Sequence, residues 1–338
     1  MGYEMDSGIP TALDNFDFRG LHPLIYMGTA SDRYAGWIGQ VYTAERYEGS
    51  IKSRTHKVGG KAFTEKVLPV ESVVEYFQHF RVLELDFTFY NTLLDGDGKP
   101  TPTYHTLSAY ARFLPEGGRL LLKVPQVVFA RKLRGKEGYA DNRSYLDVAL
   151  YRERFYEPAL RLLSTRISGF VFEQEYQRSV ERASPDEFAR DLDCFFSSIP
   201  RDGRYHVEIR TAAFLAKPVL EVMEAHGVGQ VFSHWTWLPP LSRQFQESGG
   251  RFLNERRDSV VRLMTPRGMR YEEAYQRAHP FDSLVPGMLD PKMVADTVRI
   301  MEQGVKEHAN TYVVVNNRSG GNAPLIAREI ARRCSSML

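Results

Sequence analysis

Charged side chains end several short apolar segments of this 338-residue chain, where a buried strand would ordinarily end in apolar residues. Glu84 and Asp86 do so in VLELDF, Lys123 in LLLKVP, and Glu208 and Arg210 in HVEIR. Removing an ion from water costs several kcal/mol, so such groups must pair with one another or face a ligand. Paired carboxylates beside a lysine permit general acid–base chemistry, because neighbouring charges split their pKa values.

Two interpretations fit these residues. In the first, Glu84, Lys123, Glu208 and Arg210 form a catalytic group in which a glutamate is the acid or base and the cations hold negative charge. This interpretation requires the four side chains to converge on an open pocket. In the second, the glutamates are only neutralised by Lys123, Arg210 and Arg262 in a structural ion-pair network.

Other side chains near the same segment ends are candidates for ligand binding. Aromatic rings there can stack on a sugar or a base, with loop packing as the alternative role. The candidate ligand-binding residues are Tyr34, Trp37, Asp86, Tyr90, Gln174, Trp235, Arg262, Asn316 and Asn317. In NNRSGGNAP, Arg318, Gly320 and Gly321 form a candidate anion-binding turn before a helix, and simple turn formation is the alternative.

The pattern predicts neither a metal site nor a cofactor. Among nine histidines only His234 lies just beyond a strand end, and no HxH or HExxH spacing occurs. A magnesium ion on Glu84, Asp86 or Glu208 is a weaker alternative, because nearby Lys and Arg side chains compete for the same oxygens. The glycine-rich turn lacks the GK[ST] of a nucleotide-binding loop.

The elements that must position these residues follow the pattern of a parallel sheet covered by helices. Strands are predicted at 24–27, 82–85, 119–124, 169–172, 205–209, 229–232, 260–264 and 311–315. Helices are predicted at 185–198, 214–226 and 291–308. Eight strands alternating with helices predict an α/β fold, a single (β/α)₈ TIM barrel whose C-terminal mouth carries the site.

Three connections are longer than the usual few residues and follow strands, so they are expected to lie over the mouth. They cover 29–69, 127–145 and 234–257, and the first two contain the basic stretches from Lys52 to Lys66 and from Arg131 to Arg143. Residues 1–20 are predicted to be an N-terminal extension and residues 21–338 the barrel domain.

Composition limits the possible partners and location. With 44 basic and 42 acidic residues the net charge is +2, which argues against broad electrostatic binding to nucleic acid or a membrane and leaves local basic patches open. Cys194 and Cys334 belong to no CxxC cluster, which favours a reduced, cytoplasmic location. No signal-peptide pattern or long apolar run occurs, so a soluble protein is expected. The oligomeric state is not predicted.

Five segments are together similar to one known family: MGTASDRYAGWIGQVY, LELDFTFYNTL, LLLKVPQ, HVEIR and VVVNNRSGGNAPLIARE. In this order, over about 24–334, they resemble the YecE-like family of uncharacterised TIM-barrel proteins. The resemblance implies the fold and no established activity. That barrel is similar to the xylose-isomerase and apurinic-endonuclease type, which implies a sugar or nucleic-acid ligand, although this chain lacks the histidine-rich metal cluster of those enzymes.

Matched onto this chain, the family motifs include Gly28, Thr29, Tyr34, Trp37, Glu84, Thr88, Phe89, Tyr90, Lys123, Glu208, Arg210, Asn316, Asn317, Gly321 and Ala323. Three positions depart from the family pattern. Asp32 stands where an aromatic residue is usual, Asp86 where Asn is common, and Thr211 where a histidine often follows. At these three positions the ligand could differ from that of other family members.

The leading hypothesis is a metal-independent enzyme, a hydrolase, lyase or isomerase, that acts on a small polar, sugar-like or phosphorylated molecule. One alternative is a protein that binds or processes nucleic acid through its basic loops. Another is a non-catalytic ligand-binding or scaffold barrel.

Overall fold

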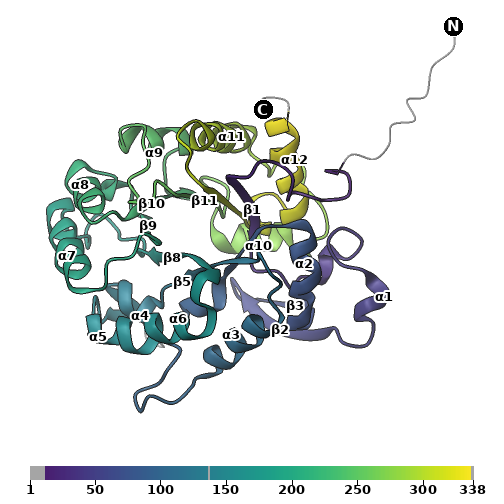
Figure 1. Ribbon diagram of the computed structural model, residues 1–338, viewed down its shortest axis with the longest axis horizontal. Helices are drawn as coiled ribbons and strands as arrows, with labels where there is room; N and C mark the ends of the chain where they lie inside the picture. Colours follow the sequence, from purple (N-terminus) through teal and green to yellow (C-terminus); the bar gives the residue numbers. More distant parts are fainter. Residues whose placement is uncertain (1–11, 136–137, 336–338) are drawn as a thin grey trace, which may run out of the picture.

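Eight short apolar segments form parallel strands that close into a barrel in the computed structural model, which describes residues 12–135 and 138–335 (Figure 1). In chain order they are β1 (Ile25–Ala30), β4 (Val82–Leu85), β5 (Arg119–Lys123), β8 (Ile167–Glu173), β9 (Tyr205–Glu208), β10 (Gly229–His234), β11 (Ser259–Leu263) and β12 (Thr311–Val315). The last strand pairs with the first, with Thr29 opposite Val315. The predicted TIM barrel is confirmed, and each strand lies within three residues of its predicted bounds.

Helices surround the barrel (Figure 1). The main ones are α2 (Val73–His79), α3 (Pro102–Phe113), α6 (Glu157–Leu163), α7 (Pro185–Ser198), α8 (Lys217–Ala225), α9 (Leu241–Glu247), α10 (Tyr271–Ala278), α11 (Pro291–Lys306) and α12 (Ala323–Ser335). The Ser184 side chain caps α7 by accepting a hydrogen bond from the backbone N–H of Glu187 at 3.1 Å. The helix predicted from residue 214 begins later, because Ala212–Phe214 forms a separate 3₁₀ turn.

The two-residue period of the strands separates an outer from an inner set of side chains. Outward residues join the large apolar core beneath the helices. Inward residues form a second cluster that fills the barrel: Ala30, Val82, Leu121, Val171, Val231, Val260, Met264, Tyr312 and Val314. Two residues further along five of these strands, the inward positions carry Glu84, Lys123, Glu173, Ser233 and Arg262. The strand period therefore places a polar layer directly above an apolar one, at the mouth.

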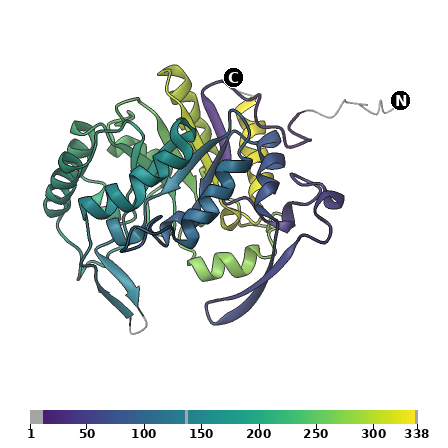
Figure 2. The same ribbon diagram turned by 60° about the horizontal axis from the view of Figure 1, so that its bottom comes forward.

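Two antiparallel hairpins project from the mouth side of the barrel (Figure 2). One joins β2 (Lys52–Val58) to β3 (Lys61–Val67), and the other joins β6 (Lys132–Gly135) to β7 (Gly138–Asp141). They occupy the first two long connections, for which the sequence analysis predicted no secondary structure. The β2–β3 hairpin packs on α10, where the rings of Phe63 and Tyr275 lie 5.2 Å apart. This contact holds the basic hairpin beside the mouth.

Part of the predicted N-terminal extension belongs to the packed structure. Phe18 is fully buried, and its ring stacks on Phe80 at 4.9 Å. Its backbone N–H also donates to the carbonyl of His79 at 2.9 Å. Phe18 therefore packs against the end of α2, while residues 1–11 of the predicted extension lie outside the described residues.

His206 leads to a prediction about stability in acid. It is fully buried on β9, neither ring nitrogen has a hydrogen-bond partner among the described residues, and burial lowers its pKa from 6.5 to about 3. The unfolded chain thus binds a proton at a pH where the folded protein does not. The contribution of His206 to the free energy of unfolding is therefore fully present above pH 6.5 and is lost as the pH is lowered. Between pH 6.5 and 5 we expect a loss of about 2 kcal/mol from this residue.

Urea unfolding of the wild-type protein and of His206→Gln as a function of pH checks this expectation. The glutamine removes the titrating group, so the free energy of unfolding of the variant relative to that of the wild type should rise by about 2 kcal/mol as the pH is lowered over this interval. Parallel curves for the two proteins would show that His206 is not held in its neutral form.

Candidate functional site

Arg262 on β11 is the centre of the polar layer at the mouth. Its side chain is fully buried, and one guanidinium nitrogen donates to Glu84 at 2.6 Å. The neighbouring nitrogen binds Glu208, which also accepts from the Ser233 hydroxyl at 2.6 Å. The two candidate catalytic glutamates are therefore joined through a single guanidinium, and neither is exposed.

Glu173 at the end of β8 holds the other two predicted cations. Its carboxylate lies 2.5 Å from the Lys123 ammonium and 2.7 Å from Arg210, which also reaches Glu208 at 3.3 Å. Burial would raise the pKa of Glu173, but Arg210, Lys123 and Arg262 outweigh it and lower that pKa to about 2. Glu173 was not among the predicted site residues, although it stands at a strand end like the others.

Glu84 differs from its neighbours because it holds a proton at neutral pH. Burial raises its pKa to about 8, opposed by Arg262 and reinforced by the nearby Asp86. One of its oxygens has no hydrogen-bond partner among the described residues. With Glu84 neutral, the buried charges balance, because Lys123, Arg210 and Arg262 face Asp86, Glu173 and Glu208.

Asp86 connects this network to a cavity. Burial would raise its pKa, but Lys123, a hydrogen bond with Glu84, Arg262 and Arg318 together lower it below 3.8. Its side chain is 28% exposed and lies 3.4 Å from the Ser31 hydroxyl, which donates to it. Asp86 is thus an ionised carboxylate at the cavity wall, and the protonated Glu84 lies behind it.

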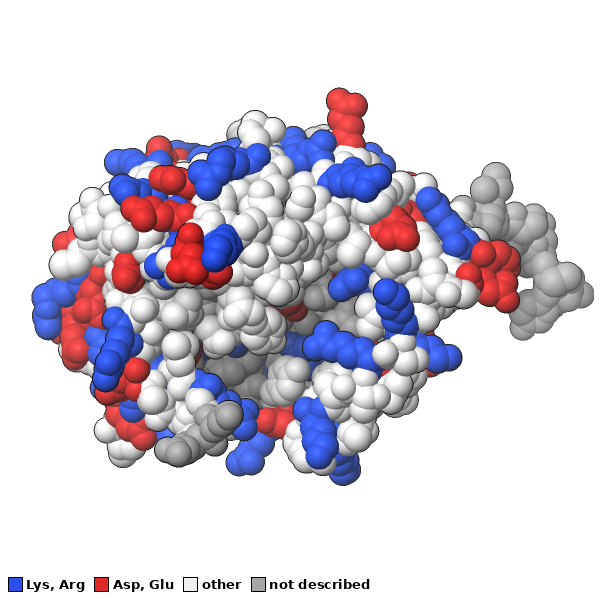
Figure 3. Space-filling view, turned by 90° about the horizontal axis from the view of Figure 1, so that it is seen from below, with Lys and Arg blue, Asp and Glu red and all other residues white. Residues whose placement is uncertain are grey.

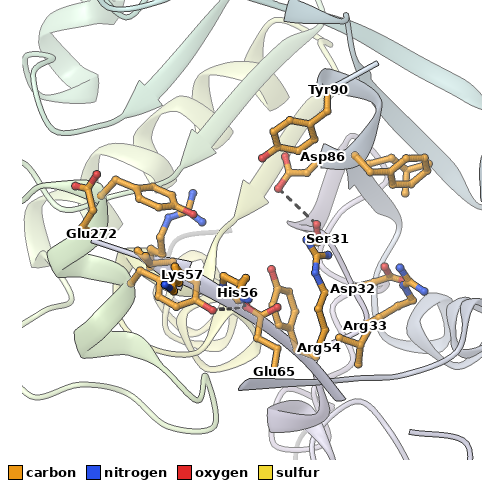
Figure 4. Close-up of a pocket in the computed structure, with 18 of the residues that line it drawn as sticks. Ser31, Asp32, Arg33, Arg54, His56, Lys57, Glu65, Asp86, Tyr90 and Glu272 are labelled. Atoms are coloured by element: carbon orange, nitrogen blue, oxygen red, sulfur yellow. Dashed lines mark hydrogen bonds and ion pairs between the residues drawn. The ribbon is translucent and has the colours of Figure 1, made fainter. Parts of the chain in front are cut away.

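The cavity has a volume of about 470 Å³ and lies between the mouth and the β2–β3 hairpin. Figure 4 shows Asp86, Ser31 and Tyr90 on the barrel side and Arg54, His56, Lys57 and Glu65 on the hairpin. Tyr34 and Arg318 also line it. Of the predicted site residues, Tyr34, Asp86, Tyr90 and Arg318 therefore meet at one pocket.

Five cations line this pocket: Arg33, Arg54, Lys57, Arg134 and Arg318. None of them forms an ion pair with another residue in the described part of the chain, whereas Lys123, Arg210 and Arg262 are all paired. Figure 3 looks onto this side of the molecule and shows a hollow bordered by Lys and Arg side chains. Unpaired cations around a concave site favour an anionic ligand.

Asp32 is a pocket residue that was noted in the sequence without a functional role. It is 1% exposed, and one carboxyl oxygen accepts a hydrogen bond from the Tyr110 hydroxyl at 2.6 Å. The other oxygen has no partner among the described residues. Burial raises its pKa to about 6, although the Tyr110 hydrogen bond and Arg33 oppose the shift. Near pH 6, Asp32 is therefore partly protonated, whereas Asp86 is ionised.

Several predicted ligand-binding residues do not line the pocket and instead form hydrogen bonds within the loops that surround it. Trp37 is fully buried and donates to the Asn317 side chain at 3.0 Å. The Asn316 side chain accepts from the backbone N–H of Arg318 at 3.0 Å. Gln174 accepts from the backbone N–H groups of Arg210 and Thr211, each at 3.0 Å. Asn316 and Gln174 therefore position the two arginines, whereas Trp37 and Asn317 fix the loop after β12.

The three residues of the predicted anion-binding turn also have different roles: one lines the pocket and two do not. Gly320 and Gly321 are buried, and a side chain on Gly321 would collide with the backbone of Ser283 and Val285. Gly321 also has a φ of +116°, a region that favours glycine. The glycines serve close packing, so Arg318 alone of the three lies in the pocket wall.

Within residues 12–135 and 138–335, no group of three or more His, Cys, Asp or Glu side chains is arranged to hold a metal ion. In the same ranges, no helix is long and apolar enough to span a bilayer. The mouth carboxylates are instead engaged by Lys and Arg.

Comparison with known families gives one assignment. Residues 47–337 match the model described as "Protein of unknown function DUF72". This chain belongs to the DUF72 family. The YecE-like resemblance seen in the sequence is confirmed, since the YecE-like family is DUF72. A comparison with curated proteins finds no match.

Solved DUF72 structures share the barrel. A DUF72 family protein from Thermotoga maritima is 18% identical and aligns over 92% of this chain and 99% of its own, with a TM-score of 0.57. A DUF72 family protein from Enterococcus faecalis is 14% identical and aligns over 93% and 98%, with a TM-score of 0.52. At these identities the likeness shows the fold alone.

Proposed function

We propose that this DUF72 protein is an acid–base enzyme that acts on a small phosphorylated, sugar-like molecule in the pocket beside the mouth. The observation that carries the proposal is the pairing of an ionised Asp86 with a protonated Glu84 at the wall of a cavity lined by unpaired cations. Adjacent carboxyl groups whose pKa values are driven apart are the usual basis of an acid–base pair.

In this proposal Glu84 and Glu208 do not contact the ligand. Both side chains are fully buried and bound to Arg262, and neither lines the pocket, so they act through their neighbours. Asp86 is the proton acceptor in this scheme. The protonated Glu84 holds the proton of the pair and acts through Asp86, with which it forms a hydrogen bond.

The ligand class follows from the pocket wall. Arg318 and the two hairpin cations Arg54 and Lys57 provide charge for a phosphate group, while the Tyr90 ring provides an apolar face for a sugar. A volume of about 470 Å³ suits a small molecule. A neutral sugar would leave the cations without a partner.

Calorimetric titration with glucose 6-phosphate, glucose and inorganic phosphate tests the ligand class. We expect glucose 6-phosphate to bind at least tenfold more tightly than glucose, and Arg318→Gln to weaken it about tenfold. Arg201→Gln, which changes an exposed arginine paired with Glu255 away from the mouth, is the matched control and should bind like the wild type. Equal affinity for glucose and glucose 6-phosphate would overturn the proposal.

Asp86→Asn tests the catalytic part. We expect this change to slow conversion of a phosphorylated sugar by a factor of about 10² to 10⁴ and to leave its binding nearly unchanged, because the amide keeps the shape and loses the base. Conversion is followed by NMR spectra of a sugar phosphate panel incubated with each protein. If no member of the panel is converted by the wild type, the protein is a binding barrel.

A further inference from the structure

The exposed aromatic side chains gather at the mouth. Six large hydrophobic residues are exposed among the described residues, and five of them are aromatic: Tyr90, Tyr139, Tyr176, Trp237 and Tyr271. Each lies on a segment that follows the C-terminal end of a barrel strand. Exposed rings at one mouth can stack on the planar groups of a ligand or partner.

Two of the mouth aromatics, together with the partly buried Trp235, form a platform beside the polar layer. The rings of Tyr176 and Trp237 stack at 5.8 Å, and Trp235 lies 6.0 Å from Tyr176. The guanidinium of Arg210 sits 5.0 Å above the Trp235 ring. The platform follows β8 and β10, whereas the pocket lies beside β1 and β4, so the two features extend over different parts of the same mouth.

The β2–β3 hairpin adds charge along the rim. Between Lys52 and Val67 there are five Lys or Arg residues and one acidic residue, although the whole chain has a net charge of only +2. Lys52, Lys61 and Lys66 are exposed, and none of the three forms an ion pair with another described residue. The acidic residue, Glu65, is bound by the Tyr275 hydroxyl. The hairpin therefore has positive charge that the protein itself does not neutralise.

Rings and unpaired cations around one barrel mouth match the chemistry of single-stranded nucleic acid. Cations track the phosphates, and rings stack on bases that are not paired. In a duplex the bases are stacked on one another, so the rings would have no face to contact. A neutral polysaccharide would use the rings and leave the hairpin lysines without a function.

We propose that the mouth of this protein binds single-stranded nucleic acid, with the phosphate backbone along the β2–β3 hairpin and bases on the exposed rings. The proposal goes beyond the function proposed for the pocket, because the exposed hairpin lysines and the Tyr176–Trp237 stack lie outside the pocket and no catalysis is required.

Fluorescence anisotropy with labelled dT₂₀, rU₂₀ and a 20-base-pair duplex tests it, at salt concentrations from 50 to 200 mM. We expect the single strands to bind at least tenfold more tightly than the duplex, and the logarithm of the binding constant to fall linearly with the logarithm of salt concentration. Equal binding of duplex and single strand, or no binding at 50 mM salt, would overturn the proposal.

Two variants separate the contributions of charge and stacking. The triple variant Lys52→Gln, Lys61→Gln, Lys66→Gln should weaken dT₂₀ binding more than tenfold and reduce the salt slope by about two. Trp237→Ser should weaken it about tenfold and leave the salt slope unchanged. If Trp237→Ser binds dT₂₀ and dextran sulfate as the wild type does, the face attracts any polyanion and the stacking proposal is wrong.

Two further proteins serve as controls. Lys306→Gln, at the end of α11, changes a cation away from the mouth and should bind dT₂₀ like the wild type. Asp86→Asn should also bind dT₂₀ normally, even if it loses activity on small molecules. Because the lysine and tryptophan changes lie outside the pocket, they should leave glucose 6-phosphate binding unchanged, so failure of either proposal can be recognised separately.

Discussion

Replacing Arg262 by Met is expected to lower the free energy of unfolding by about 3–5 kcal/mol. The change removes the guanidinium that joins Glu84 and Glu208 and leaves two buried carboxyl groups without their shared partner. Methionine retains much of the aliphatic volume, so the loss reflects electrostatics more than a cavity. Urea unfolding at pH 7 measures the difference from the wild type.

Arg243→Met is the matched control for this experiment. Arg243 forms an exposed ion pair with Glu247 at 2.8 Å on α9, and removing an exposed pair of this kind costs less than about 1 kcal/mol. The comparison holds the chemical change constant and varies only the burial. If Arg262→Met is as stable as Arg243→Met, the carboxyl groups at the mouth do not depend on Arg262.

Glu84→Gln is expected to change how stability depends on pH. The pKa of Glu84 rises from 4.5 to about 8 on folding, so its proton stabilises the folded protein fully below pH 4.5 and this contribution is lost as the pH rises through 8. The loss is about 1.4 kcal/mol for each pH unit within that interval. Glutamine is neutral at every pH, so the variant should lack this part of the pH dependence.

The difference between the unfolding free energies of wild type and Glu84→Gln isolates the effect from other titrating groups. We subtract the free energy of unfolding of Glu84→Gln from that of the wild type. This difference should be several kcal/mol larger at pH 5 than at pH 8.5. Glu208→Gln is the comparison variant. It changes a carboxylate that is bound by the side chains of Arg210, Ser233 and Arg262. A constant difference between wild type and Glu84→Gln from pH 5 to 8.5 would show that Glu84 is ionised throughout.

The barrel and its polar layer could be predicted because both follow from periodicity. Short apolar runs alternate with amphipathic segments, and residues two positions apart on a strand face the same side. Glu84, Lys123, Glu208 and Arg262 therefore had to meet once the strands were parallel and closed. The sequence could not say which cation meets which carboxylate, and Lys123 pairs with Glu173 instead of either predicted glutamate.

The pocket was not predicted, because it depends on a hairpin that crosses back over the mouth. A signal for that hairpin was present in KVGGKA, where Gly59 and Gly60 have φ values of +57° and +82° and form a two-residue turn between β2 and β3. The position of the hairpin depends on its contact with α10, more than 200 residues away in sequence. Asp32 was missed as a pocket residue for the same reason.

The predicted aromatic and amide ligands show a second limit. Trp37 and Tyr90 both lie near strand ends, yet Trp37 is fully buried and Tyr90 is 64% exposed. Sequence patterns place such residues near the mouth but do not show the direction of each side chain. That direction depends on partners such as Asn317, which accepts a hydrogen bond from the Trp37 indole.

The most direct test of the account is a ¹³C NMR titration of the side-chain carboxyl groups, with the resonances of Glu84 and Asp86 assigned from Glu84→Gln and Asp86→Asn. We predict that Glu84 titrates near pH 8 and that Asp86 stays ionised down to below pH 3.8. If both groups titrate near their ordinary values, there is no protonated carboxyl behind Asp86, and the acid–base pair at the pocket wall does not exist.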